Sequence, residues 1–550
     1  MRGRFRLRLT VPALLACIAS CKTSLPQSRL QNDTTSSQVG LNTCVALRGN
    51  GHYISTHFGG LARILEEQGE IGAIAGGSSS TITMFLHESI ALNPIISSAS
   101  SSETRAAEKS LLLKSLLGYL EAFAETPEAQ AITSMISIVE QAKKDGIFAL
   151  PSDKWQEASN KIKTILEQNK YRALINPNIF AMLSNRDSLG YANYEMKVQE
   201  IIAALKTFGS FDASDERIFF REGVLNFDAL ATLVGLVGDF YAGIHQPSQN
   251  LLVDFVKQCT PLNQGRTWAE VSSTVVGNST CGERFYNAVR TYRSAMIANG
   301  AMQSSRMEEF IGQRSPSIVV TSIIEGPAGA AALEAARGRY LKGQTPGLKL
   351  DFNDVHFGYW IPALLHTNIA SSMAARTDAK ARKFVQLGSG TTWRKAISAS
   401  PAEPGLSKAV YLSPTRISVG GWPDLHPVQI LKSSGCKNVF YITRRGQESD
   451  FIISPTPLTA NRPRKGIAEL LGANEDERSE LFDVTNPKGV FNDALKSAKG
   501  VLCTDWNKFK DAETMQMMDD AYKSQLVAPL EALAPIGDSS ALPIVGCNPL

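Results

Sequence analysis

Hydrophobic and polar positions near the start of the chain alternate in a way that predicts two strands and two helices. Thr43–Leu47 is a short apolar run, and apolar residues then recur at helical spacing over 58–65, up to Gly69. A second apolar run at 71–75 predicts another strand, and the chain continues with helical spacing over 81–90. This order of elements is typical of an α/β fold.

The pattern changes over 101–383, where long amphipathic helices are expected. The predicted helices lie at 103–125, 128–144, 154–170, 227–244 and 283–299. Short apolar runs flanked by turn residues return at 416–419, 439–443 and 501–504. We therefore expect one α/β domain built from 42–100 and 384–550, with a mostly α-helical insertion over 101–383.

The first residues carry a targeting signal. Four arginines within the first eight residues precede an apolar run at 11–18, which is too short to span a bilayer. The run ends in Ile18-Ala19-Ser20-Cys21, which is similar to a bacterial lipobox. The sequence predicts a lipoprotein signal peptide at 1–21 with Cys21 as the lipidated anchor, then a flexible polar tether at 22–41. The alternative is an ordinary secretory signal that contains a cysteine.

An anchored chain of this kind belongs in the bacterial cell envelope, and we expect it at the outer membrane, facing the periplasm or the cell surface. The 550 residues carry a formal charge of +4, and the basic residues are dispersed, which disfavours nucleic acid as a partner. Outside the signal, six cysteines remain, an even number that predicts disulfides in an exported chain, and Cys259 with Cys281 is the expected pair. No cysteine or histidine spacing suits a metal.

Ser78 is the candidate nucleophile. It lies in a G-x-S-x-S turn between a predicted strand and a predicted helix, where a strained turn can present its hydroxyl. A serine nucleophile also needs amide donors for the developing oxyanion, and Gly49, Asn50 and Gly51 follow the preceding strand. We expect Ser78 to stand exposed at a tight bend that faces these amides. The alternative is a plain strand-to-helix loop.

Two blocks resemble the patatin-like phospholipases. "CVALRGNGHYISTHFGGLARILEEQGEIGAIAGGSSST" is similar to the family's opening, and "TWRKAISASPAEPGLSKAVYLSPTRISVGGWPDLHPVQILKSSGCKNVFYI" is similar to its later segment. The resemblance implies a three-layer α/β/α domain and a serine acyl hydrolase of phospholipase A or lysophospholipase type. Its substrate would be a phospholipid or another acyl-ester lipid, with no cofactor. Ser78 would be the nucleophile, and Gly49, Asn50 and Gly51 the oxyanion site.

The family's second catalytic residue is not matched. Where the family has Asp before Gly-Gly, this chain has Val419, which cannot accept a proton. Asp424 is the nearest carboxylate and our candidate base, although it also fits a solvated loop residue. His426 is the alternative base, because its ordinary pKa suits neutral pH. His52 and His57, beside the glycine loop, either bind phosphate or simply pack.

Two other functions remain open at this stage. Val419 favours a catalytically inactive patatin-fold lipoprotein that binds lipid or a protein partner, which the sequence does not name. An unrelated helical envelope protein with a chance serine motif would contain no parallel sheet.

Overall fold

The computed structural model describes residues 41–99, 101–124, 145–146, 154–166, 178, 216–221, 223, 227–263, 285–292, 304–312, 317–325, 329–348, 354–360, 384–388, 390–402, 407–420, 427–445, 474–482, 489–505 and 514–523. The expected signal peptide, with Cys21, lies outside these residues, as does the tether up to residue 40. The helix expected at 128–144 and Cys281 lie outside them too.

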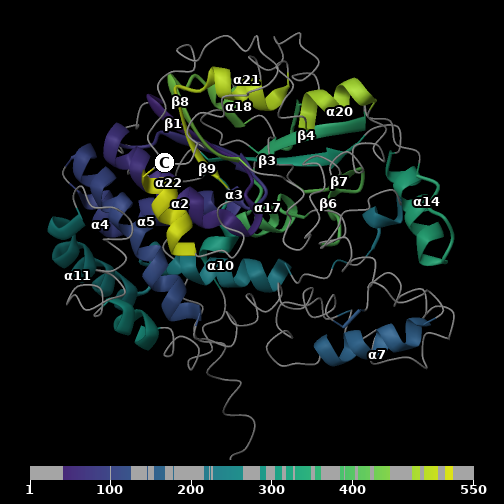
Figure 1. Cartoon of the computed structure of the whole chain (residues 1–550), viewed down its shortest axis with the longest axis horizontal. Coiled ribbons are helices and arrows are strands. Elements are labelled where there is room, and N and C mark those ends of the chain that lie inside the picture. Colours follow the sequence, from purple (N-terminus) through teal and green to yellow (C-terminus); the bar gives the residue numbers. More distant parts are fainter. Residues whose placement is uncertain are drawn as a thin grey trace, which may run out of the picture. The chain divides into compact units, whose positions relative to one another are not determined.

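The described strands form one nine-stranded sheet in the order β5-β4-β3-β2-β1-β8-β9, with β6 and β7 as a side branch on β3 (Figure 1). Their bounds are β1 Thr43–Leu47, β2 Ala73–Gly77, β3 Ser317–Ile324, β4 Val355–Trp360, β5 Phe384–Gln386, β6 Val410–Ser413, β7 Arg416–Ser418, β8 Asn438–Arg445 and β9 Gly500–Asp505. Strands β3, β2, β1, β8 and β9 pair in parallel, whereas β4 and β7 each run antiparallel to β3.

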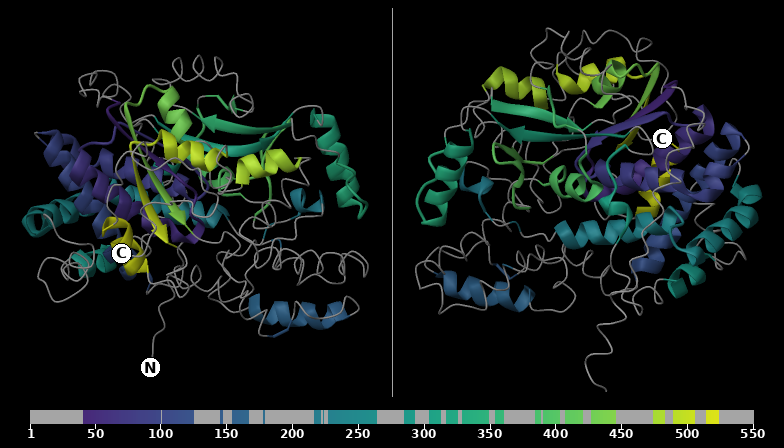
Figure 2. Two further views of the ribbon diagram at one scale, coloured as in Figure 1. Left: turned by 45° about the horizontal axis from the view of Figure 1, so that its top comes forward. Right: turned by 180° about the vertical axis from the view of Figure 1, so that it is seen from behind.

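Alternate residues of β1 pack into different apolar cores, because successive side chains of a strand point to opposite faces. Val45 and Leu47 pack on one face, and Cys44 and Ala46 on the other. Helices cover both faces (Figures 1 and 2). The first face carries α2 Ser55–Gln68, α3 Ser80–Leu92, α5 Ser102–Ala124, α10 Phe227–Tyr241, α11 Gln246–Asn263, α17 Trp393–Ala399 and α22 Thr514–Lys523, and the second α14 Gly329–Leu341, α18 Pro427–Ser433 and α21 Val490–Ser497.

This mixed, mostly parallel sheet with helices on both faces confirms the expected α/β class and the parallel order at the start of the chain. The sheet differs from the expected layout in one respect. Strands β3 and β4 fall within 101–383, so the sheet resumes at Ser317 and not after 383. Residues 317–324 (SIVVTSII) are all buried and show no alternation of apolar and polar positions, as in a strand buried on both faces. Periodicity alone does not separate such a segment from a buried helix.

Helices α5 and α10 match the predicted ones closely, and α7 (Trp155–Leu166) lies within the helix expected at 154–170, of which 167–170 fall outside the described residues. Helix α11 was not predicted, and it begins with Pro247 in its first turn, a position where proline is tolerated. In the described part of the chain, no helix combines the length and the apolar character needed to cross a membrane.

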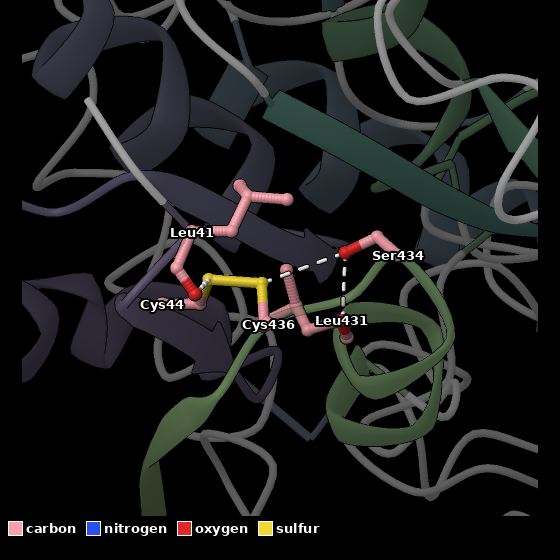
Figure 3. Close-up of a disulfide and its surroundings, with 5 residues drawn as sticks. All are labelled: Leu41, Cys44, Leu431, Ser434 and Cys436. Atoms are coloured by element: carbon pink, nitrogen blue, oxygen red, sulfur yellow. Dashed lines mark hydrogen bonds between the residues drawn. A yellow bond between two sulfur atoms is a disulfide. The ribbon is translucent and has the colours of Figure 1, made fainter. Parts of the chain in front are cut away.

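A disulfide joins Cys44 of β1 to Cys436, which lies between α18 and β8 (Figure 3). The two cysteines are separated by 392 residues, so the bridge ties the first strand to the later part of the same sheet. Ser434 donates to the carbonyl of Leu431 at 2.6 Å, which closes the end of α18 just before the bridge. Cys259 and Cys503 are also disulfide-bonded. The expectation of disulfides is confirmed, and the pairing of Cys259 with Cys281 stays a prediction.

Candidate active site

The candidate site lies where β1 and β2 end. The two strands are parallel neighbours, so the loops that follow them emerge at the same edge of the sheet. Strand β1 also pairs with β8 on its other side, so the order in which strands are added to the sheet reverses beside β1. Open α/β sheets bind ligands at the carboxyl ends of strands around such a switch point. Gly49 follows β1 and Ser78 follows β2 at this edge.

Ser78 occupies a strained backbone conformation. Its φ is +56°, and it is the one non-glycine residue with positive φ in the described part of the chain. Left-handed conformations of this kind cost non-glycine residues on the order of 1–3 kcal/mol and cluster at functional sites. The turn is closed on both sides, because Ser80 Oγ donates to the Gly77 carbonyl at 2.5 Å and Thr81 N donates to the Ser78 carbonyl at 3.0 Å. Helix α3 begins directly after it.

Gly49 lies against Ser78. A Cβ added to Gly49 would lie 2.8 Å from Ser78 Cβ and 3.5 Å from Ser78 Oγ. The distance of 2.8 Å is too short for two carbon atoms that are not bonded to each other. The two bends therefore meet, as expected from the sequence. The Gly49 amide N–H donates to no described residue, which leaves it available to a ligand.

Asn50 is committed to the structure of the loop. Its backbone N–H donates to Ser79 Oγ at 3.0 Å, and its Nδ2 donates to Thr56 Oγ1 at 2.7 Å. An amide that already donates to a side chain is not free to bind an oxyanion. Of the three residues expected to form the oxyanion site, Gly49 and Gly51 therefore remain candidates.

The expectation that Ser78 stands exposed is wrong, because the residue is 7% exposed. None of the described residues hydrogen-bonds its hydroxyl, although Ser400 Oγ accepts the Ser78 backbone N–H at 2.8 Å and donates to the Val320 carbonyl at 2.7 Å. Ser400 thus joins the serine turn to β3. Sequence reasoning did not single it out, although it lies in the SASPAEPG run that carries part of the resemblance.

Val419 and Gly420 continue β7 along β3. Val419 N donates to the Ser322 carbonyl at 2.9 Å, and Ser322 N donates to the Gly420 carbonyl at 2.8 Å. The last residue of β2, Gly77, pairs with Val320 of β3. Val320 precedes Ser322 by two residues, which is about 6.6 Å along β3. The segment that resembles the family's Asp-Gly-Gly motif therefore takes the place of β2 on β3, directly beyond Ser78. Val419 is fully buried in the apolar core.

Asp424 and His426, the two candidate bases, lie in 421–426, outside the described residues. The description stops at Gly420 and resumes at Pro427, where α18 begins. The chain between Gly420 and Asp424 can span up to about 14 Å, so its length permits an approach to Ser78.

His57 is fully buried in α2, which favours packing over the binding of phosphate. Its Nε2 lies 2.8 Å from the Arg48 carbonyl, and its Nδ1 lies 2.9 Å from Thr83 Oγ1. The His52 side chain lies outside the described residues. Within the described ranges, no group of three or more His, Cys, Asp or Glu side chains could hold a metal ion.

Two neighbouring residues further along α3 have strongly shifted pKa values. Burial raises the pKa of Glu88 to about 7, although Arg306 lies 3.2 Å away and Trp393 Nε1 donates to it. Burial lowers the pKa of His87 to about 3, and the charge of Lys109 adds to this effect. These groups lie about 15 Å along the helix from Ser78, which is too far for them to act at its hydroxyl.

The fold and this site define an α/β protein with a strained serine at the carboxyl edge of a mostly parallel sheet. No family model matches the chain, and no significantly similar curated protein or solved structure was found.

Proposed function

We propose that the chain is a serine-dependent acyl hydrolase of patatin-like fold that acts on phospholipids or other acyl-ester lipids. The observation that carries the proposal is the contact between Ser78, held at φ +56°, and Gly49 on the neighbouring strand end. Strained serine turns beside free amides are the geometry that serine nucleophiles require. The resemblance of the two sequence blocks supplies the lipid-ester substrate and the patatin-like assignment. In that fold, the helices within 101–316 would form the insertion.

The proposed mechanism uses residues of this chain only. Ser78 Oγ attacks the ester carbonyl while its proton passes to Asp424 or His426, and the amides of Gly49 and Gly51 stabilise the oxyanion. Collapse of the tetrahedral intermediate releases the lipid alcohol, which takes up the proton. Water then adds to the acyl-enzyme, assisted by the same base, and the fatty acid leaves as Ser78 regains its proton.

The test is reaction with an alkyl fluorophosphonate, followed by fatty-acid release from phospholipid vesicles. We expect covalent labelling of the native chain that is lost in Ser78→Ala, together with fatty-acid release that shows the same dependence. Asp424→Asn and His426→Gln separate the two bases, since only loss of the true base abolishes turnover. An unlabelled but folded native protein would refute the hydrolase.

A second function is favoured by Val419, which is fully buried where a proton acceptor would be needed. A catalytically inactive chain of the same fold would bind lipid or a partner at the site. Such a protein would remain unlabelled, and its affinity for vesicles would be the same in the native chain and in Ser78→Ala.

We also propose that the chain is a lipid-anchored protein of the bacterial envelope. The disulfide between Cys44 and Cys436 supports an oxidising compartment, because disulfides persist mainly in exported proteins. Incorporation of an alkynyl fatty acid in bacterial cells, lost in Cys21→Ser, tests the anchor. Equal labelling of both forms would contradict it.

A further inference from the structure

His57 joins three parts of the candidate site through its two ring nitrogens. A carbonyl oxygen only accepts hydrogen bonds, so the contact of Nε2 with the Arg48 carbonyl at 2.8 Å requires a proton on Nε2. Nδ1 then accepts from the hydroxyl of Thr83 at 2.9 Å. The ring thus connects α2 to the end of β1 and to α3, the helix that begins directly after Ser78. Its position is fixed because it is fully buried.

The contact with Arg48 determines the direction of the next amide. The described chain has no cis peptide bond, and in a trans peptide the carbonyl and the following N–H point in opposite directions. Arg48 N donates to Ile442 of β8 at 3.0 Å, and His57 binds the Arg48 carbonyl. The Gly49 N–H therefore points away from His57. Strand β2 lies on the side of β1 opposite β8, and Gly49 packs against Ser78 there.

We infer that His57 is a positioning residue of the oxyanion site, which holds the Arg48–Gly49 peptide so that the Gly49 N–H faces the Ser78 side chain. This inference rests on the proposed function and deepens it. His57 is not the base, because both of its ring nitrogens are engaged within the protein. Thr83 supports it by keeping the proton on Nε2.

The test compares two substitutions at the same buried position. His57→Gln keeps an amide donor near the position of Nε2, whereas His57→Phe keeps the ring volume and removes the donor. We expect His57→Phe to lower kcat for a p-nitrophenyl ester by about 10- to 100-fold with KM within about twofold, as for a weakened oxyanion donor. We expect His57→Gln to retain most of the kcat. The acid side of its profile of kcat against pH should lie at the same pH as in the native chain. The rate of phosphonylation by fluorophosphonate follows the same order.

His87→Phe is the matched control, because it makes the same change at a buried histidine of α3 whose ring nitrogens have no hydrogen-bond partner among the described residues. We expect its kcat to equal that of the native chain. Thr83→Val provides a second route if His57→Phe does not fold: kcat falls about fivefold because Nδ1 loses its donor, and Thr83→Ser restores most of the loss.

The outcomes separate the two proposals. If the native chain reacts through Ser78 and folded His57→Phe reacts as fast as His57→Gln, the positioning role is refuted and the hydrolase stands. An unchanged rate in Thr83→Val has the same meaning. If the native chain does not react, the hydrolase itself fails and the role of His57 falls with it.

Discussion

Gly49 and Ser78 are in contact at the ends of two neighbouring strands, and no side-chain carbon fits on Gly49 without a clash with Ser78. A Cβ on residue 49 would lie 2.8 Å from Ser78 Cβ and 3.3 Å from the Gly77 carbonyl oxygen. Both obstacles belong to the serine turn, so a substitution at Gly49 must displace that turn. A glycine therefore occupies this position because any side chain there would clash with the serine turn.

The first prediction follows from that contact. We expect Gly49→Ala to lower the rate of fluorophosphonate labelling at least tenfold, because the displaced turn moves Ser78 Oγ away from the amide donor. Gly338→Ala is the matched control, since its added Cβ would have no atom within 4 Å. Gly338 lies inside α14, so this control should leave labelling unchanged and raise the unfolding free energy by about 0.5–1 kcal/mol. Equal labelling rates in the two variants would contradict the prediction.

The strained turn gives a second prediction that does not depend on catalysis. Glycine adopts positive φ without the cost that a side chain imposes. Ser78→Gly should therefore be more stable than Ser78→Ala by about 1 kcal/mol, measured by urea unfolding. Both variants lack the hydroxyl, so their difference isolates the backbone. A Ser78→Ala chain that is as stable as Ser78→Gly would show that the turn relaxes in solution.

Local pattern was sufficient to predict the part of the fold around the site. Strand β1, helix α2 and the turn at Ser78 follow from apolar spacing and from Gly69, which ends the helix at φ +81°. Their meeting point was also predictable, because parallel neighbours place their loops at one edge. Strand β3 was missed because its eight residues show no alternation, and it sits among helices in the sequence.

The contacts that complete the site could not be predicted from local pattern. Ser400 Oγ accepts the Ser78 N–H although the two residues are 322 positions apart in the sequence. No local pattern around either residue predicts this contact. The burial of Ser78 likewise depends on distant elements. The loss of the Asn50 amide to Ser79 depends on the geometry of two turns, which a sequence motif does not specify.

Ser400 provides the third prediction. Ser400→Ala removes both the acceptor of the Ser78 N–H and the donor to the Val320 carbonyl, and it leaves both groups buried. We expect the unfolding free energy to fall by about 1–3 kcal/mol and the labelling rate to fall several-fold, because the turn loses its tie to β3. Ser98→Ala, which removes an exposed hydroxyl bonded only within its own helix, is the control. Unchanged labelling in Ser400→Ala would show that the turn at Ser78 keeps its conformation without the hydrogen bonds of Ser400.

The disulfide should act on stability without acting on the site. Cys44→Ala combined with Cys436→Ala opens a loop of 392 residues, and we expect the unfolding free energy to fall by about 2–5 kcal/mol. Cys44 lies near the start of β1, about 16 Å along the strand from Gly49, so labelling of Ser78 in the folded protein should be unchanged. Urea unfolding with and without reductant measures the first effect, and reductant should lower the midpoint of the native chain more than that of the variant.

His87 and Glu88 should give opposite dependences of stability on pH, although they are neighbours on α3. The pKa of Glu88 is raised to about 7 in the folded chain, so its contribution to stability is full below its ordinary pKa of 4.5 and is lost as the pH rises to 7. The pKa of His87 is lowered to about 3, so its contribution is full above the ordinary value of 6.5 and is lost as the pH falls. Between pH 4.5 and 6.5 the two effects oppose each other in the native chain.

Removing either side chain should therefore reveal the pH dependence of stability that the other one causes. In His87→Gln the unfolding free energy should fall relative to the native chain as the pH rises from 4.5 to 6.5, by up to about 1.4 kcal/mol per pH unit. In Glu88→Gln it should rise over the same interval, because only the histidine effect remains. Urea unfolding at three pH values in this range measures both slopes, and their difference cancels the titration of the rest of the chain. Two variants whose curves run parallel to that of the native protein would mean that neither group changes its pKa on folding, and that burial in α3 is relieved by water at both positions.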